Sequence, residues 1–499
     1  MIKRPNILLI TTDQQRADHI GLEGLKAVQT PNLDRLGREG LYFKRGYTCS
    51  PVCTPARVSL LTGKYPSRDG AYSIGVSTDL SRERTLPSLL TDSGYHTALF
   101  GKSHFVERKK EIQHISGQEN PGPDFFREFD GPYLGFDKVA LSSGHTINAV
   151  PEGHYRCFLE DVGGDYEQWF PQLGPDYDHD ATGVWEIPIA YHDSTWVGNC
   201  TTEFISSQAS SGKPWFAWAS LQDPHEPHVC PKEWMDRVDV PAMEIPEAYR
   251  EGEFDDKPWF YRQAYEEGNF GSIDDAFGTP CAGRRQALTD KRIEALHATL
   301  GMIAGIDDQV GRILDALETT GQAENTIIIF TSDHGEYHGH HGFWGKGLPA
   351  YEDIHRVPFL IWGPGRIKKT GPTKALASVI DLPKTMLDLA GATAPVGMQG
   401  VSLVSIFNGE VDHVQEDVLI ELRAVESFSQ HSLITDRYKL VVYETLEEGE
   451  LYDLQEDPNQ YRNLWHEPDH LQLKAGLLQR LARRYQAGEG VRTARTSFA

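Results

Sequence analysis

The sequence predicts an α/β fold in which a large, mostly parallel sheet is flanked by helices. Several apolar runs of strand length show no alternation, which is typical of strands buried on both faces of a parallel sheet. The clearest runs are at residues 6–10, 97–100, 215–221 and 326–330. Helical patterns lie between them, at residues 86–93, 195–207 and 290–319. This alternation of strands with helices indicates α/β architecture.

Each of these four runs ends in a cluster of polar residues. The clusters are Thr11–Asp13, Gly101–His104, Gln222–His225 and Thr331–His334. Ligands of open α/β sheets bind outside the carboxyl ends of the strands. Since all four clusters follow strands in this way, we expect them to converge on one active site.

The rest of the chain predicts loops over that site and a second, smaller domain. Residues 105–194 and 229–289 are rich in Gly, Pro, Asp and aromatic residues, and we expect long loops there. After about residue 405 the pattern changes: residues 432–443 predict two short strands around a turn, and residues 471–485 a closing amphipathic helix. We therefore expect a catalytic α/β domain at 1–405 and a smaller α+β domain at 406–499.

The composition argues against several classes of partner. The chain has 72 Asp+Glu against 48 Lys+Arg, a formal charge of −24, which repels nucleic acid and anionic membranes. The apolar run near the N-terminus, Ile7–Ile10, is too short for a signal peptide, and no run reaches membrane-spanning length. The six cysteines are widely spaced, so we expect no disulfide framework and a cytoplasmic protein.

The sharpest motif is Cys53-Thr-Pro-Ala-Arg57. Thr54 is a suitable cap and Pro55 suits a first turn, so we expect Cys53 just before a helix N-terminus, where negative charge is stabilised. By itself this motif would be read as a buried cysteine before a helix. Cys-x-Pro-x-Arg is, however, the recognition core for conversion of cysteine to formylglycine in type I sulfatases.

With this motif the chain resembles the type I, formylglycine-dependent sulfatases of the alkaline phosphatase superfamily. Further segments that carry the resemblance are 5–13, 331–346, 356–359 and 451–458. The resemblance implies an alkaline-phosphatase-like fold and hydrolysis of a sulfate monoester, with arylsulfatase-like chemistry. It also implies a formylglycine derived from Cys53, made by a formylglycine-generating enzyme, and it leaves a homo-oligomer open.

The resemblance assigns one divalent metal ion to Asp13, Gln14, Cys53, Asp333 and His334. Oxygen-rich ligation suits Ca²⁺, Mg²⁺ or Mn²⁺. Many sulfatases have Asp-Asp at the first of these places and Asp-Asn at the second. The departures in this chain also occur in the choline-sulfatase-like and phosphonate-monoester-hydrolase-like branches. The imidazole moves the preference toward Mn²⁺, and family grounds keep Ca²⁺ ahead.

The resemblance also assigns the catalytic side chains: Cys53, Arg57, Lys102, His104, His225 and Lys346. Together with the metal, the basic groups are expected to form a positive pocket for a sulfate ester. In the implied scheme, His225 protonates the departing alcohol or phenol, and His104 is the base that lets the aldehyde re-form. No role is assigned to His228 and His355. The segment His338-Gly-His-His341 could suggest zinc, but we interpret its histidines as loop side chains near the pocket mouth.

Three alternatives differ in chemistry. A phosphonate monoester or phosphodiester hydrolase of the same superfamily would share the metal ligands, but it generally lacks Gly-Lys-x-His, so Lys102 and His104 favour sulfate esters. Because no signal peptide is expected, we expect a small-molecule sulfate ester rather than an extracellular polymer. A two-metal phosphatase needs a Ser or Thr nucleophile, which Cys53 opposes. A non-catalytic, degenerate sulfatase is opposed by the retained nucleophile, carboxylates and basic groups.

Overall fold

The structure of the chain, a computed structural model, describes residues 4–488 apart from short internal gaps. The undescribed residues inside this range are 75–77, 81–82, 107–110, 112, 114, 118–122, 144–151, 165–168, 170–180, 247–248, 268–283, 286–289, 425–427 and 445. Cys281 and parts of the two expected loop segments therefore lie outside the described residues.

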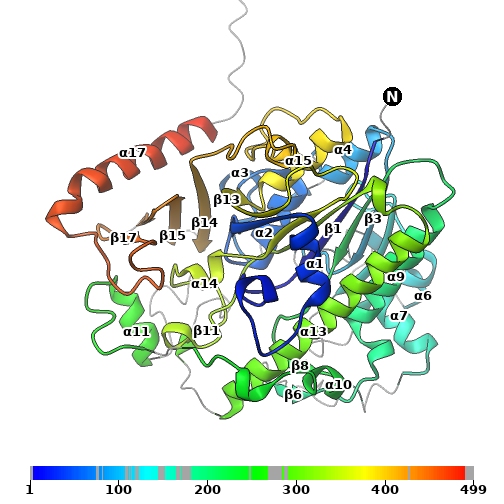
Figure 1. Cartoon of the computed structure of the whole chain (residues 1–499), viewed down its shortest axis with the longest axis horizontal. Coiled ribbons are helices and arrows are strands. Elements are labelled where there is room, and N and C mark those ends of the chain that lie inside the picture. The colour runs from blue at the N-terminus through cyan, green and yellow to red at the C-terminus, as the bar shows by residue number, and fades with distance from the viewer. Residues whose placement is uncertain are drawn as a thin grey trace, which may run out of the picture.

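Among the described residues, one sheet of nine strands dominates the molecule (Figure 1). From one edge to the other its strands are β13 (Gly371–Ser378), β2 (Leu41–Tyr47), β12 (Phe359–Trp362), β10 (Thr326–Ser332), β1 (Asn6–Thr12), β7 (Trp215–Ser220), β3 (His96–Gly101), β4 (Lys138–Ser143) and β5 (Glu152–Gly153). β12 runs antiparallel to both of its neighbours and β5 antiparallel to β4, whereas the other pairs are parallel. The predicted mostly parallel sheet is confirmed.

The helices are of very different lengths. They are α1 (Pro31–Glu39), α2 (Cys53–Thr62), α3 (Pro66–Asp69), α4 (Leu86–Asp92), α6 (Pro123–Glu128), α7 (His154–Asp161), α9 (Asp193–Gln208), α10 (Lys232–Met235), α11 (Trp259–Glu267), α13 (Asp290–Thr319), α14 (Glu352–His355), α15 (Asp381–Ala390), α16 (Val404–Phe407) and α17 (Leu471–Gly488). The three helices predicted between the strands are confirmed as α4, α9 and α13. α4 begins where it does because the Thr85 side chain accepts a hydrogen bond from the backbone of Ser88 and Pro87 lies in the first turn.

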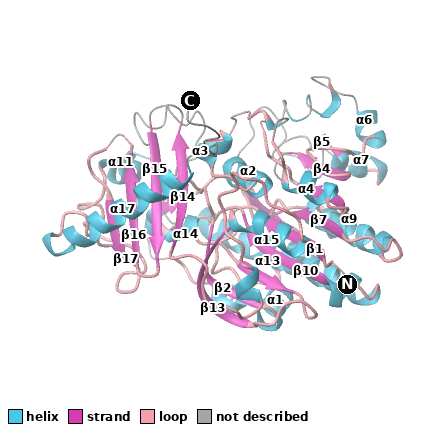
Figure 2. Ribbon diagram, turned by 90° about the horizontal axis from the view of Figure 1, so that it is seen from above, coloured by secondary structure: helices cyan, strands magenta, loops and turns pink. Residues whose placement is uncertain are grey.

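Alternate residues of β1 face opposite sides of the main sheet. Ile7 and Leu9 pack into one hydrophobic cluster with α2, α4 and α15, whereas Leu8 and Ile10 pack into another with α1, α9 and α13. All four side chains are fully buried. A strand covered on both faces has no side for polar residues, which is why its sequence is apolar without alternation. Figure 2 shows helices on both sides of this sheet.

A second sheet of four antiparallel strands lies to one side of the main sheet (Figure 2). Its strands are β14 (Asp417–Ala424), β15 (Phe428–Thr435), β16 (Tyr438–Tyr443) and β17 (Glu450–Asp453). The predicted pair of strands at 432–443 and the closing helix are confirmed as β15, β16 and α17. Leu433 and Leu440 of this sheet belong to the same hydrophobic cluster as Ile7 of β1. A domain boundary at residue 405 stays a prediction.

The two segments expected to be long loops contain more regular structure than their sequences suggested. β4 joins the main sheet beside β3, and α6, α7, α10 and α11 are helices. Two small sheets pair β6 (Thr182–Val184) with β8 (His228–Cys230), and β9 (Arg284–Arg285) with β11 (Phe343–Trp344). Aromatic side chains such as Tyr155 and Trp196, whose rings pack against each other, hold these short elements in place. No helix of the described residues is long and apolar enough to cross a lipid bilayer.

Candidate active site

The two predicted metal carboxylates lie side by side at the carboxyl edge of the main sheet. β1 and β10 pair in parallel with Thr12 opposite Ser332, so the next residues, Asp13 and Asp333, leave the sheet together. The backbone N–H of Asp333 donates to the carbonyl of Thr12 at 3.3 Å. Both carboxylates are fully buried. The in-register pairing of the strands therefore places two oxygen ligands at one point.

Cys53 is directed at these carboxylates from the N-terminus of α2. It is the first helical residue, after Val52, and Thr54 does not cap the helix, so the expected position one residue before the helix is wrong. Its Sγ lies 3.6 Å from Asp13 Oδ1 and 3.2 Å from His334 Nε2. Burial and Asp13 raise the pKa of the thiol to about 12. The unmodified thiol therefore stays protonated unless a cation is bound beside it.

Four of the predicted ligands form a donor set that fits a divalent cation. Each of the four residues offers one ligand atom, and these atoms lie within 4.8 Å of one another; the residues are Asp13, Cys53, Asp333 and His334, and all are buried. His334 Nδ1 donates to the carbonyl of Gly335 at 2.9 Å, which leaves the lone pair of Nε2 directed toward the carboxylates, 3.7 Å from an oxygen of each. Two carboxylates and one such imidazole can hold a divalent ion.

Two cations compensate the carboxylates. Arg57, one turn after Cys53, donates from Nε to Asp333 Oδ2 at 2.8 Å and lies 3.5 Å from Asp13 Oδ2 through Nη2. Lys102, which follows β3, forms an ion pair with Asp13. Burial alone would raise the pKa of Asp13, but Lys102 and other cations, Arg57 among them, hold it well below its usual range. Asp13 is therefore ionised and ready to bind a cation.

Gln14, Lys346 and His225 meet on the other side of Cys53. Lys346 Nζ lies 3.1 Å from Cys53 Sγ, donates to Gln14 Oε1 at 2.8 Å and lies 2.5 Å from His225 Nε2. His225 Nδ1 lies 2.6 Å from the carbonyl of Glu226. If Nδ1 donates this bond, Nε2 is left as the acceptor of the Lys346 proton. Lys346 thus links position 53 to the histidine predicted to protonate the leaving group.

His104 is half-buried two residues after Lys102, and its backbone is left-handed with φ 52°. Burial and the positive charges of Lys102 and Arg57 keep its pKa well below the usual value for histidine. The ring is therefore neutral near pH 7, which is the form that a general base requires.

Two carboxylates at this site, Glu226 and Glu336, were not found from the sequence. Gln14 Nε2 donates to Glu226 Oε2 at 2.6 Å and also to Glu336. Burial and the negative charge of Glu226 raise the pKa of Glu336 to about 7. The sequence offered one indication of both carboxylates, namely their closeness to predicted site residues: Glu226 directly follows His225, and Glu336 comes two residues after His334.

Of the three histidines interpreted as loop side chains near the pocket mouth, His338 and His341 are buried, so the interpretation is wrong for these two, whereas His340 is partly exposed. His228, His338, His341 and His355 are all buried. His341 stacks on Tyr351 with ring centroids 3.7 Å apart. Buried imidazoles at these positions pack inside the protein rather than line an entrance.

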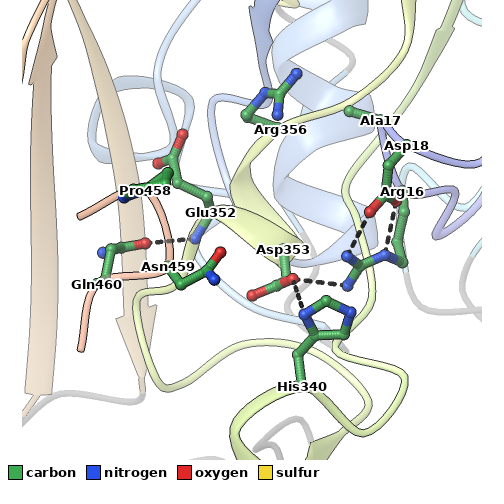
Figure 3. A pocket seen from close by; sticks show the side chains of 10 residues that line it. All are labelled: Arg16, Ala17, Asp18, His340, Glu352, Asp353, Arg356, Pro458, Asn459 and Gln460. Carbon is green, nitrogen blue, oxygen red and sulfur yellow. Dashed lines mark hydrogen bonds and ion pairs between the residues drawn. The ribbon is translucent and has the colours of Figure 1, made fainter. Parts of the chain in front are cut away.

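A separate cavity of about 160 Å³ lies around Arg16 and Asp353 (Figure 3). Arg16 bridges Asp18 and Asp353 at 2.7 and 2.8 Å. On the opposite wall the backbone N–H of Glu352 donates to Gln460 Oε1 at 2.7 Å. None of the predicted site residues lines this cavity. The ion pair between Arg16 and Asp353 joins the N-terminal part of the chain to α14, and the Glu352 hydrogen bond joins α14 to the segment before α17.

The comparisons with known proteins agree with this geometry. The Sulfatase family model matches residues 5–392, and the model for the C-terminal region of N-sulphoglucosamine sulphohydrolase matches residues 339–487. The arylsulfatase of Clostridium perfringens is 30% identical over 477 residues, covering 92% of this chain and 90% of that protein. The choline-sulfatase of Rhizobium meliloti is 29% identical over 474 residues, covering 93% and 83%.

A solved structure shows the same fold. The phosphonate monoester hydrolase of Silicibacter pomeroyi superposes with a TM-score of 0.78 at 23% sequence identity, and the match covers 99% of this chain and 100% of the other. Together with the family match over most of the chain, this makes the architecture that of the alkaline-phosphatase-like sulfatases. The chain belongs to the sulfatase family and is a sulfuric ester hydrolase.

Proposed function

We propose that the enzyme hydrolyses small-molecule sulfate monoesters, in the manner of an arylsulfatase, through a formylglycine formed from Cys53. The observation that carries this proposal is the position of the Cys53 side chain. The buried cation ligands Asp13 and His334 lie on one side of its Sγ, at 3.6 and 3.2 Å, and Lys346 lies on the other at 3.1 Å. A nucleophile generated at this position would have a divalent ion beside it and a proton donor within reach.

The proposed metal ligands are Asp13, Asp333 and His334, with Gln14 next to them and the modified residue 53 completing the set. A divalent ion held there would lower the pKa of a hydroxyl on residue 53 and neutralise charge on the sulfate. We propose Ca²⁺ on family grounds, with Mn²⁺ as the alternative, because His334 contributes a nitrogen ligand.

The basic side chains have separate tasks in this proposal. Lys102 now neutralises Asp13. A divalent ion on Asp13 would take over that neutralisation, which would release the Lys102 ammonium to bind the ester oxygens. Arg57 keeps Asp333 oriented through the 2.8 Å bond from Nε.

Proton transfer is assigned to the two histidines. When the sulfur–oxygen bond of the ester breaks, His225 Nε2 passes to the departing oxygen a proton that it accepts from Lys346, whose Nζ lies 2.5 Å away. His104, kept neutral by its neighbours, accepts the proton whose loss releases sulfate from residue 53. Because these roles fall on different side chains, their variants are expected to fail at different steps.

Mass spectrometry of the peptide that contains residue 53 tests the first step of the proposal. Formylglycine is about 18 Da lighter than cysteine, because CHO replaces CH₂–SH. We expect this lighter peptide after coexpression with a formylglycine-generating enzyme and unmodified cysteine without it. Activity that is the same in both preparations would overturn the proposal.

The rival function is hydrolysis of phosphonate monoesters or phosphodiesters. The presence of Lys102 and His104 favours sulfate esters, because the phosphonate-monoester-hydrolase-like relatives generally lack the Gly-Lys-x-His segment that contains them. We expect kcat/KM for 4-nitrophenyl sulfate to exceed that for an aryl phosphonate monoester. The reverse order would assign the chain to the rival reaction.

The cellular setting forms part of the same proposal. Cys49, Cys53, Cys157, Cys200 and Cys230 are free thiols. We propose a cytoplasmic enzyme that meets a formylglycine-generating enzyme during maturation, and a homo-oligomer as its assembled state. Fractionation and light scattering of the native protein test these two points.

A further inference from the structure

A second group of metal-binding side chains lies next to the reaction centre, and one of its members, Glu336, accepts a hydrogen bond from Gln14 there. One ligand atom each from His228, Glu336 and His338 lie within 4.8 Å of one another. All three side chains are buried, with His338 only 2% exposed. They come from β8 and from the segment between β10 and β11, which are far apart in the sequence.

The contacts of His338 do not explain why a histidine is buried at this position. Neither of its ring nitrogens has a hydrogen-bond partner, although the ring is buried. Its backbone is left-handed, with φ 48°, a conformation that non-glycine residues seldom adopt. A buried polar group without a partner destabilises a fold, and a bound ion is one of the few things that compensate it.

The neighbours of His338 pack against its ring without bonding to its nitrogens. His19 stacks on it with ring centroids 5.2 Å apart, and His228 and Trp344 approach at 5.4 and 5.8 Å. Burial and the nearby His19, His228 and Arg16 keep the pKa of His338 well below the usual value, so its imidazole is neutral. Neutral imidazoles are the form that binds transition metals.

We propose that His228, Glu336 and His338 form a second metal site, which binds a divalent transition-metal ion of the zinc type. Two imidazoles and one carboxylate are a known ligand set for zinc, with a further position for water. Ligand atoms around a tetrahedral zinc are about 3.4 Å apart, so only small side-chain movements are needed to close the set. The set differs from the oxygen-rich reaction centre, and the two sites are expected to prefer different ions.

The charges around the site permit a cation. Arg16 donates to the carbonyl of Glu336 at 2.9 Å, but the positive charge of Arg16 is already neutralised by its ion pairs with Asp18 and Asp353. Glu336 accepts from Gln14, and Gln14 Oε1 accepts from Lys346. The second site is thus one carboxamide away from the reaction centre, so its occupancy is expected to alter the position or charge of Lys346.

Zinc binding to the whole enzyme tests the proposal with Zn²⁺ alone as the probe. The protein is stripped with a chelator, titrated with Zn²⁺ by calorimetry, and analysed for metal after dialysis. His338→Phe keeps the ring contacts but removes both nitrogens. We expect it to lose about one zinc ion per chain and to weaken binding about 100-fold or more, beyond the 10- to 100-fold cost of losing an outer partner. His228→Phe is expected to behave in the same way.

Two control variants separate this site from its surroundings. His340→Ala changes a partly exposed histidine two residues away, which pairs with Asp353 at 3.1 Å, and is expected to keep the zinc. Cys53→Ala removes a ligand of the reaction centre and is also expected to keep it. If His338→Phe and His228→Phe retained the zinc of the unmodified protein, the proposal would be wrong.

A crystallographic measurement needs no variant. Anomalous scattering at the zinc edge, from crystals of the unmutated enzyme soaked in Zn²⁺, is expected to show a peak between His228, Glu336 and His338. Electron density for water alone at that point, with zinc bound elsewhere or not at all, would overturn the proposal even if every variant failed to fold.

Discussion

Arg57 is a fully buried guanidinium whose charge is balanced by two buried carboxylates, Asp333 and Asp13. Removing one partner from such a network leaves the others charged in a medium of low polarity. We therefore expect Arg57→Met to lower the free energy of unfolding by about 3–5 kcal/mol. Urea denaturation followed by circular dichroism measures this loss.

An exposed ion pair provides the control. Arg84 and Asp92 are 2.6 Å apart, with side chains 61% and 66% exposed. Arg84→Ala is expected to change stability by less than about 1 kcal/mol, because water already solvates both charges. Equal losses in the two variants would contradict the claim that burial makes Arg57 important.

The side chain at position 53 determines whether the enzyme can release sulfate and begin a second turnover. A serine there has one hydroxyl, so after it attacks sulfur no second hydroxyl remains to expel the sulfate. We expect Cys53→Ser to react once with 4-nitrophenyl sulfate and to gain about 80 Da as a stable sulfate ester. Intact-protein mass spectrometry measures the gain, with Cys53→Ala as the unreactive control. Multiple turnovers by Cys53→Ser would contradict the formylglycine scheme.

At the scale of elements, α17 packs on the second sheet through a narrow apolar stripe, beside the ion pairs of Arg480 and Arg484 with Asp417 of β14. Leu477 and Leu481 of this helix are 4% exposed, whereas the adjacent Leu478 is 37% exposed. We expect Leu477→Ala to cost about 2–4 kcal/mol of unfolding free energy and Leu478→Ala less than about 1 kcal/mol. Thermal denaturation of the two variants compares them directly. Similar melting temperatures would mean that α17 packs less tightly than these contacts indicate.

His431 of β15 packs edge-on against Tyr485 of α17, with ring centroids 5.2 Å apart. Burial lowers its pKa from 6.5 to about 4. Between these two values the unfolded chain binds more protons than the folded chain, so stability falls as the pH falls through this window. We expect the unmutated enzyme to lose roughly 2 kcal/mol more than His431→Gln between pH 7 and pH 4. Parallel losses in denaturation experiments would contradict this assignment.

The elements that the sequence predicted well are those with one dominant physical signal. β1 and β10 are buried on both faces, and α13 spans the residues that its periodicity indicated. β4 and α7 were missed because they are short and depend on contacts with distant residues, which local patterns do not contain: β4 pairs with β3, and Tyr155 of α7 packs against Trp196. The predicted start of α2 was one residue too late, because Thr54 is a residue type that often caps helices but does not cap this one.

At the scale of the whole molecule, the sheet made the site predictable. Residues at the ends of parallel strands must meet, so Asp13 and Asp333 could be paired from the sequence alone. The contacts of Glu226 and Glu336 with Gln14 could not, because they depend on side-chain directions in segments that follow the strands. We expect the leaving group to contact segments of the same kind, whose side-chain directions the sequence does not reveal. The sequence motifs therefore do not identify the leaving group.

The side chains around residue 53 do not by themselves form a positively charged pocket. The protein as a whole carries a formal charge of −24. Near residue 53 the carboxylates are Asp13, Asp333, Glu226 and Glu336. The cations are Arg57, Lys102 and Lys346. The histidines His104 and His334, whose pKa values are lowered by burial, add no positive charge near neutral pH. The side chains alone therefore leave this region close to neutral.

A divalent ion on Asp13 and Asp333 would make the same region positive and would attract a sulfate monoanion against the field of the acidic protein. We therefore expect the metal-free enzyme to bind 4-nitrophenyl sulfate at least about tenfold more weakly than the enzyme restored with Ca²⁺ or Mn²⁺. Calorimetry with Cys53→Ala, which cannot turn the ester over, measures binding without reaction. The neutral product 4-nitrophenol is the control ligand, and its affinity is expected to change little. If the ester bound equally well with and without the ion, the lysines and Arg57 would be sufficient for anion binding, and the ion would serve the chemical step alone.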